Sequence, residues 1–181
     1  MSADVTVRIL TEDDVPALTA LLVANRDHLA PWEPQRPEEY FTEEFQRGDV
    51  ARLLEVHRQG GVLPGVVLVD GEPVGRVSVN NVVRGVFLSG DLGYWVSRHV
   101  TGRGVATAAV AAMARLAFGE AGLHRLQAGT LLHNAASQRV LRKNGFTAIG
   151  VAPRYLRIAG RWQDHLLFQL LAGEAAVPGM R

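Results

Sequence analysis

Residues 101–107 (TGRGVAT) lie where a strand-like run ends and a long apolar helical run begins. Residues 90–96 before them are rich in aromatic and branched side chains, and residues 106–122 after them are rich in alanine. Glycines at such a junction let backbone N–H groups approach an anion, because no Cβ stands in the way. The first N–H groups of a helix also lack intrahelical partners and carry a partial positive charge. The segment therefore predicts a strand–turn–helix unit that binds phosphate, with an ordinary helix start as the alternative.

Two familiar phosphate-binding loops do not fit this segment. A P-loop requires Gly-Lys followed by Ser or Thr, and the chain has no such tripeptide. A dinucleotide fingerprint requires a third Gly or Ala where Thr107 stands. It also requires an acidic residue after the next strand, and residues 127–132 contain none. We therefore set both types of nucleotide loop aside.

Length and composition indicate one globular domain. The chain has 181 residues, of which 48% are hydrophobic and 20% charged, enough to bury a sizeable core. We expect a single domain over residues 1–171 and a short frayed tail over residues 172–181. The net charge of +1 provides no general attraction for DNA or a membrane surface, so neither is an expected partner. The absence of cysteine excludes disulfides and thiol catalysis and is consistent with a cytoplasmic protein.

The order of the predicted elements indicates an α/β protein. Strands are expected at residues 5–10, 65–69, 73–79, 90–96, 125–132, 146–158 and 162–171, and helices at residues 11–22, 37–58, 106–122 and 134–144. Asp70-Gly71 predicts a tight hairpin turn, and residues 80–87 are expected to form a loop. This order predicts a sheet of mixed strand direction.

The six histidines raise the question of a metal site. None is arranged as His-x-x-x-His or His-Glu-x-x-His, so we expect no metal and structural roles for these side chains. His133, at the end of a predicted strand, is the one histidine that we consider as a base.

Several short motifs occur together with the glycine turn. They are Pro31-Trp32-Glu33-Pro34, NVVRG at 81–85, LGYW at 92–95, Asn134 with Ser137, KNGF at 143–146 and GRWQDH at 160–165. Over nearly the whole chain they resemble the RimJ/RimL branch of the GNAT N-acetyltransferase superfamily, and they are closer to RimJ. The resemblance implies the GNAT fold, a single mixed and mostly antiparallel twisted sheet with helices on both faces. It also implies acetyl transfer from acetyl-CoA to the N-terminus of a ribosomal protein.

The same resemblance implies where acetyl-CoA binds. Its pyrophosphate would meet the backbone of Gly102, Arg103, Gly104, Val105, Ala106 and Thr107, and its pantetheine arm would contact Tyr94, Trp95, Val96 and Asn134. A splay of the sheet would expose backbone groups there, and the Val96 N–H could polarise the thioester carbonyl. The superfamily loop usually begins with Gln or Arg, where this chain has Thr101. Arg98 or Arg103 could supply the missing charged contact.

The acceptor must be a neutral amine. An α-amine has a pKa of about 7.7–8.0 and a lysine side chain one of about 10.4, so the α-amine is far more often neutral near pH 7.5. A weak base acting through water is then sufficient. We consider Asp91 first and Glu33 second, each either as this base or as the group that binds the substrate ammonium.

The leaving thiolate requires a proton donor. Many GNAT enzymes use a tyrosine seven residues after the Asn that starts the helix, a position that Leu141 occupies here. Ser137 matches a serine of the RimJ/RimL branch and is our candidate donor, with polarity of the first helical turn as the alternative interpretation. Further along the helix, Arg139, Arg142 and Lys143 could contact the CoA 3′-phosphate or remain in solvent.

Three interpretations of the function are therefore kept open. The first is direct acetyl transfer in a ternary complex to a protein N-terminus of the alanine type, since no cysteine could carry the acetyl group. The second is the same reaction on a small-molecule amine such as an antibiotic, polyamine or amino acid. The third is an acyl-CoA-binding module without catalysis. Homodimer formation through the apolar final strand is a further hypothesis.

Overall fold

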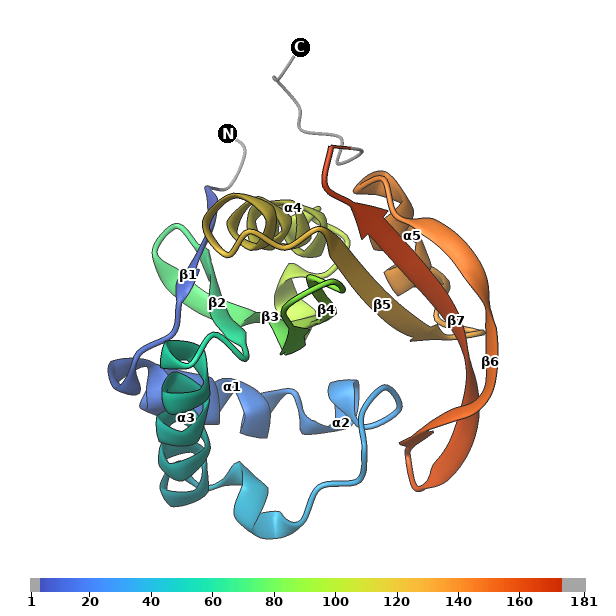
Figure 1. Ribbon diagram of the computed structural model, residues 1–181. Helices are drawn as coiled ribbons and strands as arrows, with labels where there is room; N and C mark the ends of the chain where they lie inside the picture. The colour runs from blue at the N-terminus through green and yellow to red at the C-terminus, as the bar shows by residue number, and fades with distance from the viewer. Residues whose placement is uncertain (1–3, 174–181) are drawn as a thin grey trace.

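The computed structural model describes residues 4–173, and a twisted sheet forms its centre (Figure 1). Its strands are β1 (Val5–Ile9), β2 (Leu63–Val69), β3 (Glu72–Val83), β4 (Ser89–Val96), β5 (Arg125–Leu131), β6 (Thr147–Ile158) and β7 (Arg161–Leu171). The seven strands lie in the order β1-β2-β3-β4-β5-β7-β6. The pair β4–β5 is parallel and the other neighbouring pairs are antiparallel. This confirms the predicted mixed, mostly antiparallel α/β sheet.

Helices cover both faces of the sheet. The α-helices are α1 (Val15–Ala24), α2 (Arg26–Leu29), α3 (Glu43–Arg58), α4 (Val105–Arg115) and α5 (Ala135–Lys143), and the short turns are η1 (Glu12–Asp14), η2 (Glu38–Phe41), η3 (Arg98–Val100) and η4 (Leu116–Glu120). Figure 1 shows α4 on one side of the sheet and α1 and α3 on the other. We call these two sides the α4 face and the α1 face. Within residues 4–173 no helix has both the length and the hydropathy that a membrane span requires.

Strand β2 shows how the sequence produces two cores. Its side chains alternate between the faces, as in any strand. Val67 packs with Val77 and Met113 in the core under α4, whereas Val66 and Leu68 belong to the core under α1 and α3. Both faces of this strand are therefore buried, which explains its unbroken apolar sequence.

Two turn predictions from the sequence are confirmed. Asp70 and Gly71 connect β2 to β3 with φ angles of 50° and 88°, as expected for the favoured two-residue hairpin turn. Gly145 follows the end of α5 with a φ of 83°, a left-handed conformation that glycine adopts without steric cost. In both places the conformation depends on a neighbouring pair of residues, so the sequence alone identifies it.

Two predicted boundaries are wrong. Residues 80–83 belong to β3 rather than to a loop, because Val83 still pairs with Ser89 across a register shift. Asn81 adopts a φ of 49° at this irregularity. The irregularity accommodates Asn80 and Asn81, a residue type that is disfavoured in regular strands. The helix expected over 106–122 ends as an α-helix at Arg115 and continues as the π-helical turn η4, which the N–H of Ala121 closes on the carbonyl of Leu116 at 3.0 Å. The predicted tail lies outside the described residues from position 174 onward.

Candidate active site

A cleft of about 590 Å³ opens where β4 and β5 separate. Strand β4 pairs with β5 only from Ser89 to Asp91, so the sheet splays apart beyond Asp91 as predicted. The first turn of α4, one side of α5 and the end of α2 complete the walls. This cleft brings together most of the predicted cofactor residues, namely Tyr94, Trp95, Val96, Gly102, Gly104, Val105, Ala106, Thr107, Asn134 and Ser137. Arg103 is exposed and does not line the cleft.

The glycine turn at one end of the cleft has the geometry of an anion site. Gly102 and Gly104 have φ angles of 75° and 82°, and Gly104 is the residue that precedes the first turn of α4. No atom lies within 4 Å of the position that a Cβ would take at either glycine. The N–H of Ala108 is bonded to the carbonyl of Gly104 at 3.0 Å, so the amides before Ala108 remain available at the helix start. These amides are therefore free to donate hydrogen bonds to a phosphate.

The free edge of β4 forms one side of the cleft. The N–H of Ser97 donates to the carbonyl of Val74 on β3 at 2.7 Å, and β3 and β4 are in regular antiparallel register from there to Asp91. Because bonded and non-bonded pairs alternate in such a ladder, Tyr94 and Val96 direct their N–H and C=O groups away from β3. Those groups face the gap left by β5. The register therefore supports the prediction that the Val96 N–H is exposed in the cleft.

A buried polar network holds the segment between β4 and α4. The side chain of Asn25, at the end of α1, donates from Nδ2 to Ser97 Oγ at 2.9 Å and accepts the N–H of Arg98 at 2.8 Å. Ser97 Oγ also lies 2.8 Å from Nδ1 of His99. Asn25 and Ser97 are almost completely buried. No local pattern in the sequence could predict this network, because Ser97 and Arg98 lie more than 70 positions from Asn25.

Asn134 and Ser137 are arranged as the sequence predicts. Asn134 precedes α5, and its Oδ1 accepts the N–H of Ser137 at 3.1 Å, which is the side-chain capping contact expected at a helix start. The hydroxyl of Ser137 lies 2.7 Å from the hydroxyl of Tyr94 across the cleft. Burial raises the pKa of Tyr94 to about 12, against the opposing effect of its hydrogen bond to Ser137. Tyr94 therefore stays protonated and acts as a hydrogen-bond donor.

The sequence predicted Tyr94 as a cofactor contact but did not predict that its hydroxyl would meet Ser137. Strand alternation required one of Tyr94 and Trp95 to face the helices, and Tyr94 has the same parity as Leu92, which is in the core under α4. Leu141, at the position where related enzymes carry a tyrosine, is completely buried and cannot contact a substrate. Tyr94 from β4 and Ser137 from α5 are thus the two hydroxyl-bearing side chains that meet in this part of the cleft.

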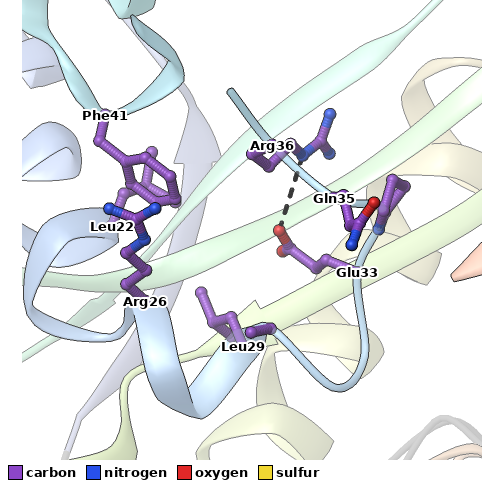
Figure 2. Close-up of a pocket in the computed structure, with 9 residues that line it drawn as sticks. Leu22, Arg26, Leu29, Glu33, Gln35, Arg36 and Phe41 are labelled. Atoms are coloured by element: carbon purple, nitrogen blue, oxygen red, sulfur yellow. Dashed lines mark ion pairs between the residues drawn. The ribbon is translucent and has the colours of Figure 1, made fainter. Parts of the chain in front are cut away.

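A second cavity of about 370 Å³ lies beside the cleft (Figure 2). Leu29 borders both cavities, and Glu33 and Arg36 point into the second one. Glu33 Oε2 is 3.9 Å from Arg36 Nε, and burial raises the pKa of Glu33 in spite of the positive charges of Arg36 and Arg76. The backbone of Glu33 is fixed by the N–H of Ala159, which donates to its carbonyl at 2.9 Å.

Of the remaining candidate residues, Asp91 and Arg142 lie outside the cleft, whereas Arg139 and Lys143 line it. Asp91 lies at the closed end of the splay, where its Oδ2 accepts Nδ2 of Asn81 at 2.9 Å, and it lines neither cavity. Arg139 and Lys143 line the cleft, whereas Arg142 stacks on Phe168 with 5.6 Å between the guanidinium and the ring centroid.

The histidines vary in their surroundings. His133 is exposed with its ring 5.6 Å from that of Trp32, and His165 is buried with Nδ1 2.9 Å from the carbonyl of Gln163. His165 is thus a structural histidine, as predicted. Among residues 4–173 no cluster of His, Asp and Glu side chains suits a metal ion.

Comparison with known proteins agrees with this geometry. A family described as acetyltransferase (GNAT) domain matches residues 4–147. The [ribosomal protein uS5]-alanine N-acetyltransferase of Escherichia coli (strain K12) is 33% identical over 166 residues, which covers 91% of this chain and 86% of the relative. The probable N-acetyltransferase YjcK of Bacillus subtilis (strain 168) is 32% identical over 167 residues, covering 91% and 92%.

Solved structures give the same picture. Mycobacterium smegmatis RimJ in complex with CoA-disulfide superimposes with a TM-score of 0.91 at 35% identity, covering 96% of this chain and 84% of that one. The ribosomal-protein-S5-alanine acetyltransferase of Vibrio fischeri superimposes with a TM-score of 0.89 at 31% identity, covering 96% of both chains.

Proposed function

This chain belongs to the GNAT acetyltransferase family and is an acetyl-CoA-dependent N-acetyltransferase, and we propose that its acceptor is the α-amine of a protein N-terminus. The target class is a ribosomal protein with an alanine-type N-terminus, by analogy with the relatives named above. One observation carries the mechanism. The cleft beside the free edge of β4 adjoins a second cavity through the shared residue Leu29. Donor and acceptor can therefore occupy adjoining cavities, which suits direct transfer in a ternary complex.

The donor side is assigned to the glycine turn and the edge of β4. The amides from Gly102 to Thr107 bind the pyrophosphate of acetyl-CoA, and the exposed backbone groups of Tyr94 and Val96 bind its pantetheine arm. The N–H of Val96 stabilises negative charge on the thioester oxygen, an effect that is typically about 3 kcal/mol. Arg139 and Lys143 line the same cleft and supply positive charge for the phosphates.

Ser137 and Tyr94 are assigned to the leaving thiolate. A thiol has a pKa of about 8.5, so proton transfer to it from a hydroxyl of pKa about 12 would be uphill by about 5 kcal/mol. We therefore assign the pair a hydrogen-bonding role, in which Ser137 donates to the sulfur and Tyr94 orients the Ser137 hydroxyl. The proton that neutralises the thiolate comes from the attacking amine.

The acceptor side favours an α-amine over a lysine. At pH 7.5 roughly a quarter of α-amines are neutral, against roughly one lysine side chain in a thousand. A carboxylate whose pKa is raised toward neutrality is a better base than an ordinary one. Glu33 meets this condition because of its burial, and it lines the acceptor-side cavity. Asp91, at the closed end of the splay, is the alternative base or ammonium-binding group.

The deciding experiment uses three peptides with acetyl-CoA and mass spectrometry. The first has a free N-terminal alanine and no lysine, the second a blocked N-terminus and an internal lysine, and the third has neither amine. We expect one acetyl group on the first peptide alone. Acetylation of the second peptide at an equal rate would contradict α-amine selectivity.

A small-molecule acceptor is the second candidate, because the acceptor-side cavity is only about 370 Å³. A panel of amino acids, polyamines and aminoglycosides, assayed for CoA release, tests it in parallel. Binding of acetyl-CoA with no turnover on any amine would instead support the non-catalytic module.

A further inference from the structure

Arg76 occupies an unusual position on the α1 face of the sheet. It lies on β3 directly opposite Trp95 of β4, and Trp95 lines the cleft. Directly opposed residues of antiparallel strands point to the same face, and Leu92 and Tyr94 mark the other face as the α4 face. Arg76 therefore points to the α1 face, where it lines neither cavity but lies close enough to Glu33 of the second cavity for the two charges to influence each other.

One nitrogen of this guanidinium, Nε, is buried without a partner, and the side chain as a whole is partly buried. Its Nε is inaccessible to solvent and has no hydrogen-bond partner, and Arg76 takes part in none of the ion pairs found among residues 4–173. Burial lowers the pKa of Arg76, although nearby Asp49, Tyr40 and Glu33 act in the opposite direction. Buried polar groups in proteins are normally hydrogen-bonded, so an anion bound by this guanidinium would supply the contact that its Nε lacks.

Neither neighbouring carboxylate supplies that anion. Asp49 Oδ1 on α3 is bound by Arg52 Nη2 at 2.7 Å, and the carboxylate of Glu33 is 3.9 Å from Arg36. Each carboxylate already has an arginine of its own. Neither carboxylate forms an ion pair with Arg76, although both lie near enough for their charges to raise its pKa.

The floor of the sheet next to Arg76 is open. Gly93 precedes Trp95 by two residues on the same face of β4 and is exposed, although β4 is an interior strand. A Cβ at Gly93 would meet nothing closer than Nδ2 of Asn80 at 3.7 Å. A peptide can therefore lie across this glycine and reach the sheet between Arg76 and the free edge of β4.

We propose that Arg76 binds a carboxylate on the side chain of the second residue of the acceptor, so that the preferred substrates are N-termini with Asp or Glu in that position. The spacing agrees. Neighbouring strands are about 4.8 Å apart, and the carboxylate of a second residue lies about 7 Å from the α-amine of an extended peptide. An amine at the edge of β4 thus presents this carboxylate above β3. The inference rests on the proposed function, because it assumes a protein N-terminus as the acceptor.

The test compares three peptides that differ only at the second residue, Ala-Glu, Ala-Gln and Ala-Lys. We expect kcat/KM of the natural enzyme to be at least about tenfold higher for the Glu peptide than for the Gln peptide, the effect of a charge-assisted hydrogen bond. Equal values for these two peptides would overturn the role of Arg76 and leave the proposed function standing. Acetylation of none of the peptides would remove the proposed function and this inference with it.

Variants connect the preference to the residue. In Arg76→Gln the kcat/KM for the Glu peptide should fall to that for the Gln peptide, and Arg76→Lys should retain part of the preference because it keeps the charge. Arg58→Gln, on the exposed side of α3, makes the same charge change and should keep the full preference. A preference that persists in Arg76→Gln overturns the inference, and Arg76→Lys with the natural enzyme decides the question if Arg76→Gln does not fold.

Discussion

The contact between Tyr94 and Ser137 gives the most informative test of catalysis. The two hydroxyls are 2.7 Å apart, one on β4 and the other in the first turn of α5. Tyr94→Phe removes one hydroxyl and keeps the ring that packs under α4, so the fold should lose only about 1 kcal/mol. Ser137→Ala removes the proposed donor itself.

The expected magnitudes follow from the role of each hydroxyl. A hydrogen bond to a charged group contributes about 1.5–3 kcal/mol, so Ser137→Ala should lower kcat by about 10²-fold through loss of the bond to the thiolate. Tyr94→Phe removes only the orienting partner, and a neutral hydrogen bond of about 1 kcal/mol corresponds to about fivefold in kcat. Because the two hydroxyls act in series, the double variant should be no worse than Ser137→Ala.

The assay is CoA release at saturating acetyl-CoA and peptide, with Tyr155→Phe as a control. Tyr155 is a half-exposed tyrosine on β6, and its substitution should leave kcat as it is. A thioester donor with a more acidic leaving thiol should show a smaller effect of Ser137→Ala, because its thiolate needs less stabilisation. An unchanged kcat in Ser137→Ala, or strictly additive losses in the double variant, would refute the reasoning.

Three further perturbations test the surrounding structure. Gly104→Val places a branched side chain at a φ of 82°, so Tm should fall by about 4–8 °C for about 2 kcal/mol of strain, as measured by calorimetry. The KM for acetyl-CoA, measured from initial rates, should rise at least about tenfold. An unchanged KM would contradict the anion site. Asn25→Ala leaves the Arg98 N–H without its partner and removes one of the partners of the Ser97 hydroxyl. Chemical denaturation should therefore show a loss of about 2 kcal/mol, and calorimetric titration should show weaker CoA binding. Full CoA affinity would limit Asn25 to a stabilising role. Burial raises the pKa of Glu33, so its carboxyl group favours folding fully below the unfolded pKa of about 4.3, and this stability is lost as pH rises through the folded pKa. Glu33→Gln should therefore be more stable than the natural protein at pH 7 and equally stable near pH 4. The reverse order would contradict the raised pKa.

The parts of the site that the sequence predicted are those governed by neighbouring residues. The glycine turn, the capping of α5 by Asn134 and the Asp70-Gly71 hairpin each depend on a few consecutive positions. Local chemistry at such positions leaves few conformations available, so a pattern of residue types is sufficient to recognise them.

The parts that escaped prediction depend on tertiary pairing. Tyr94 and Ser137 meet across 43 positions, and Asn25 reaches Ser97 across 72. The extension of β3 to Val83 depends on its partner β4, which overrides the poor strand preference of the Asn pair. The unpaired Nε of Arg76 could not be predicted either, because a single arginine in a strand does not indicate whether a carboxylate will lie beside it.

The short parallel ladder between β4 and β5 has a consequence for the whole molecule. Only three residue pairs join these strands, so the sheet consists of two halves, β1 to β4 and β5 to β7, connected by a short parallel ladder. A ligand that fills the gap beyond Asp91 would act as a missing strand and bridge the halves. Binding of the acetyl donor would then also connect the two halves of the sheet beyond Asp91, so that the substrate becomes part of the sheet in the bound enzyme.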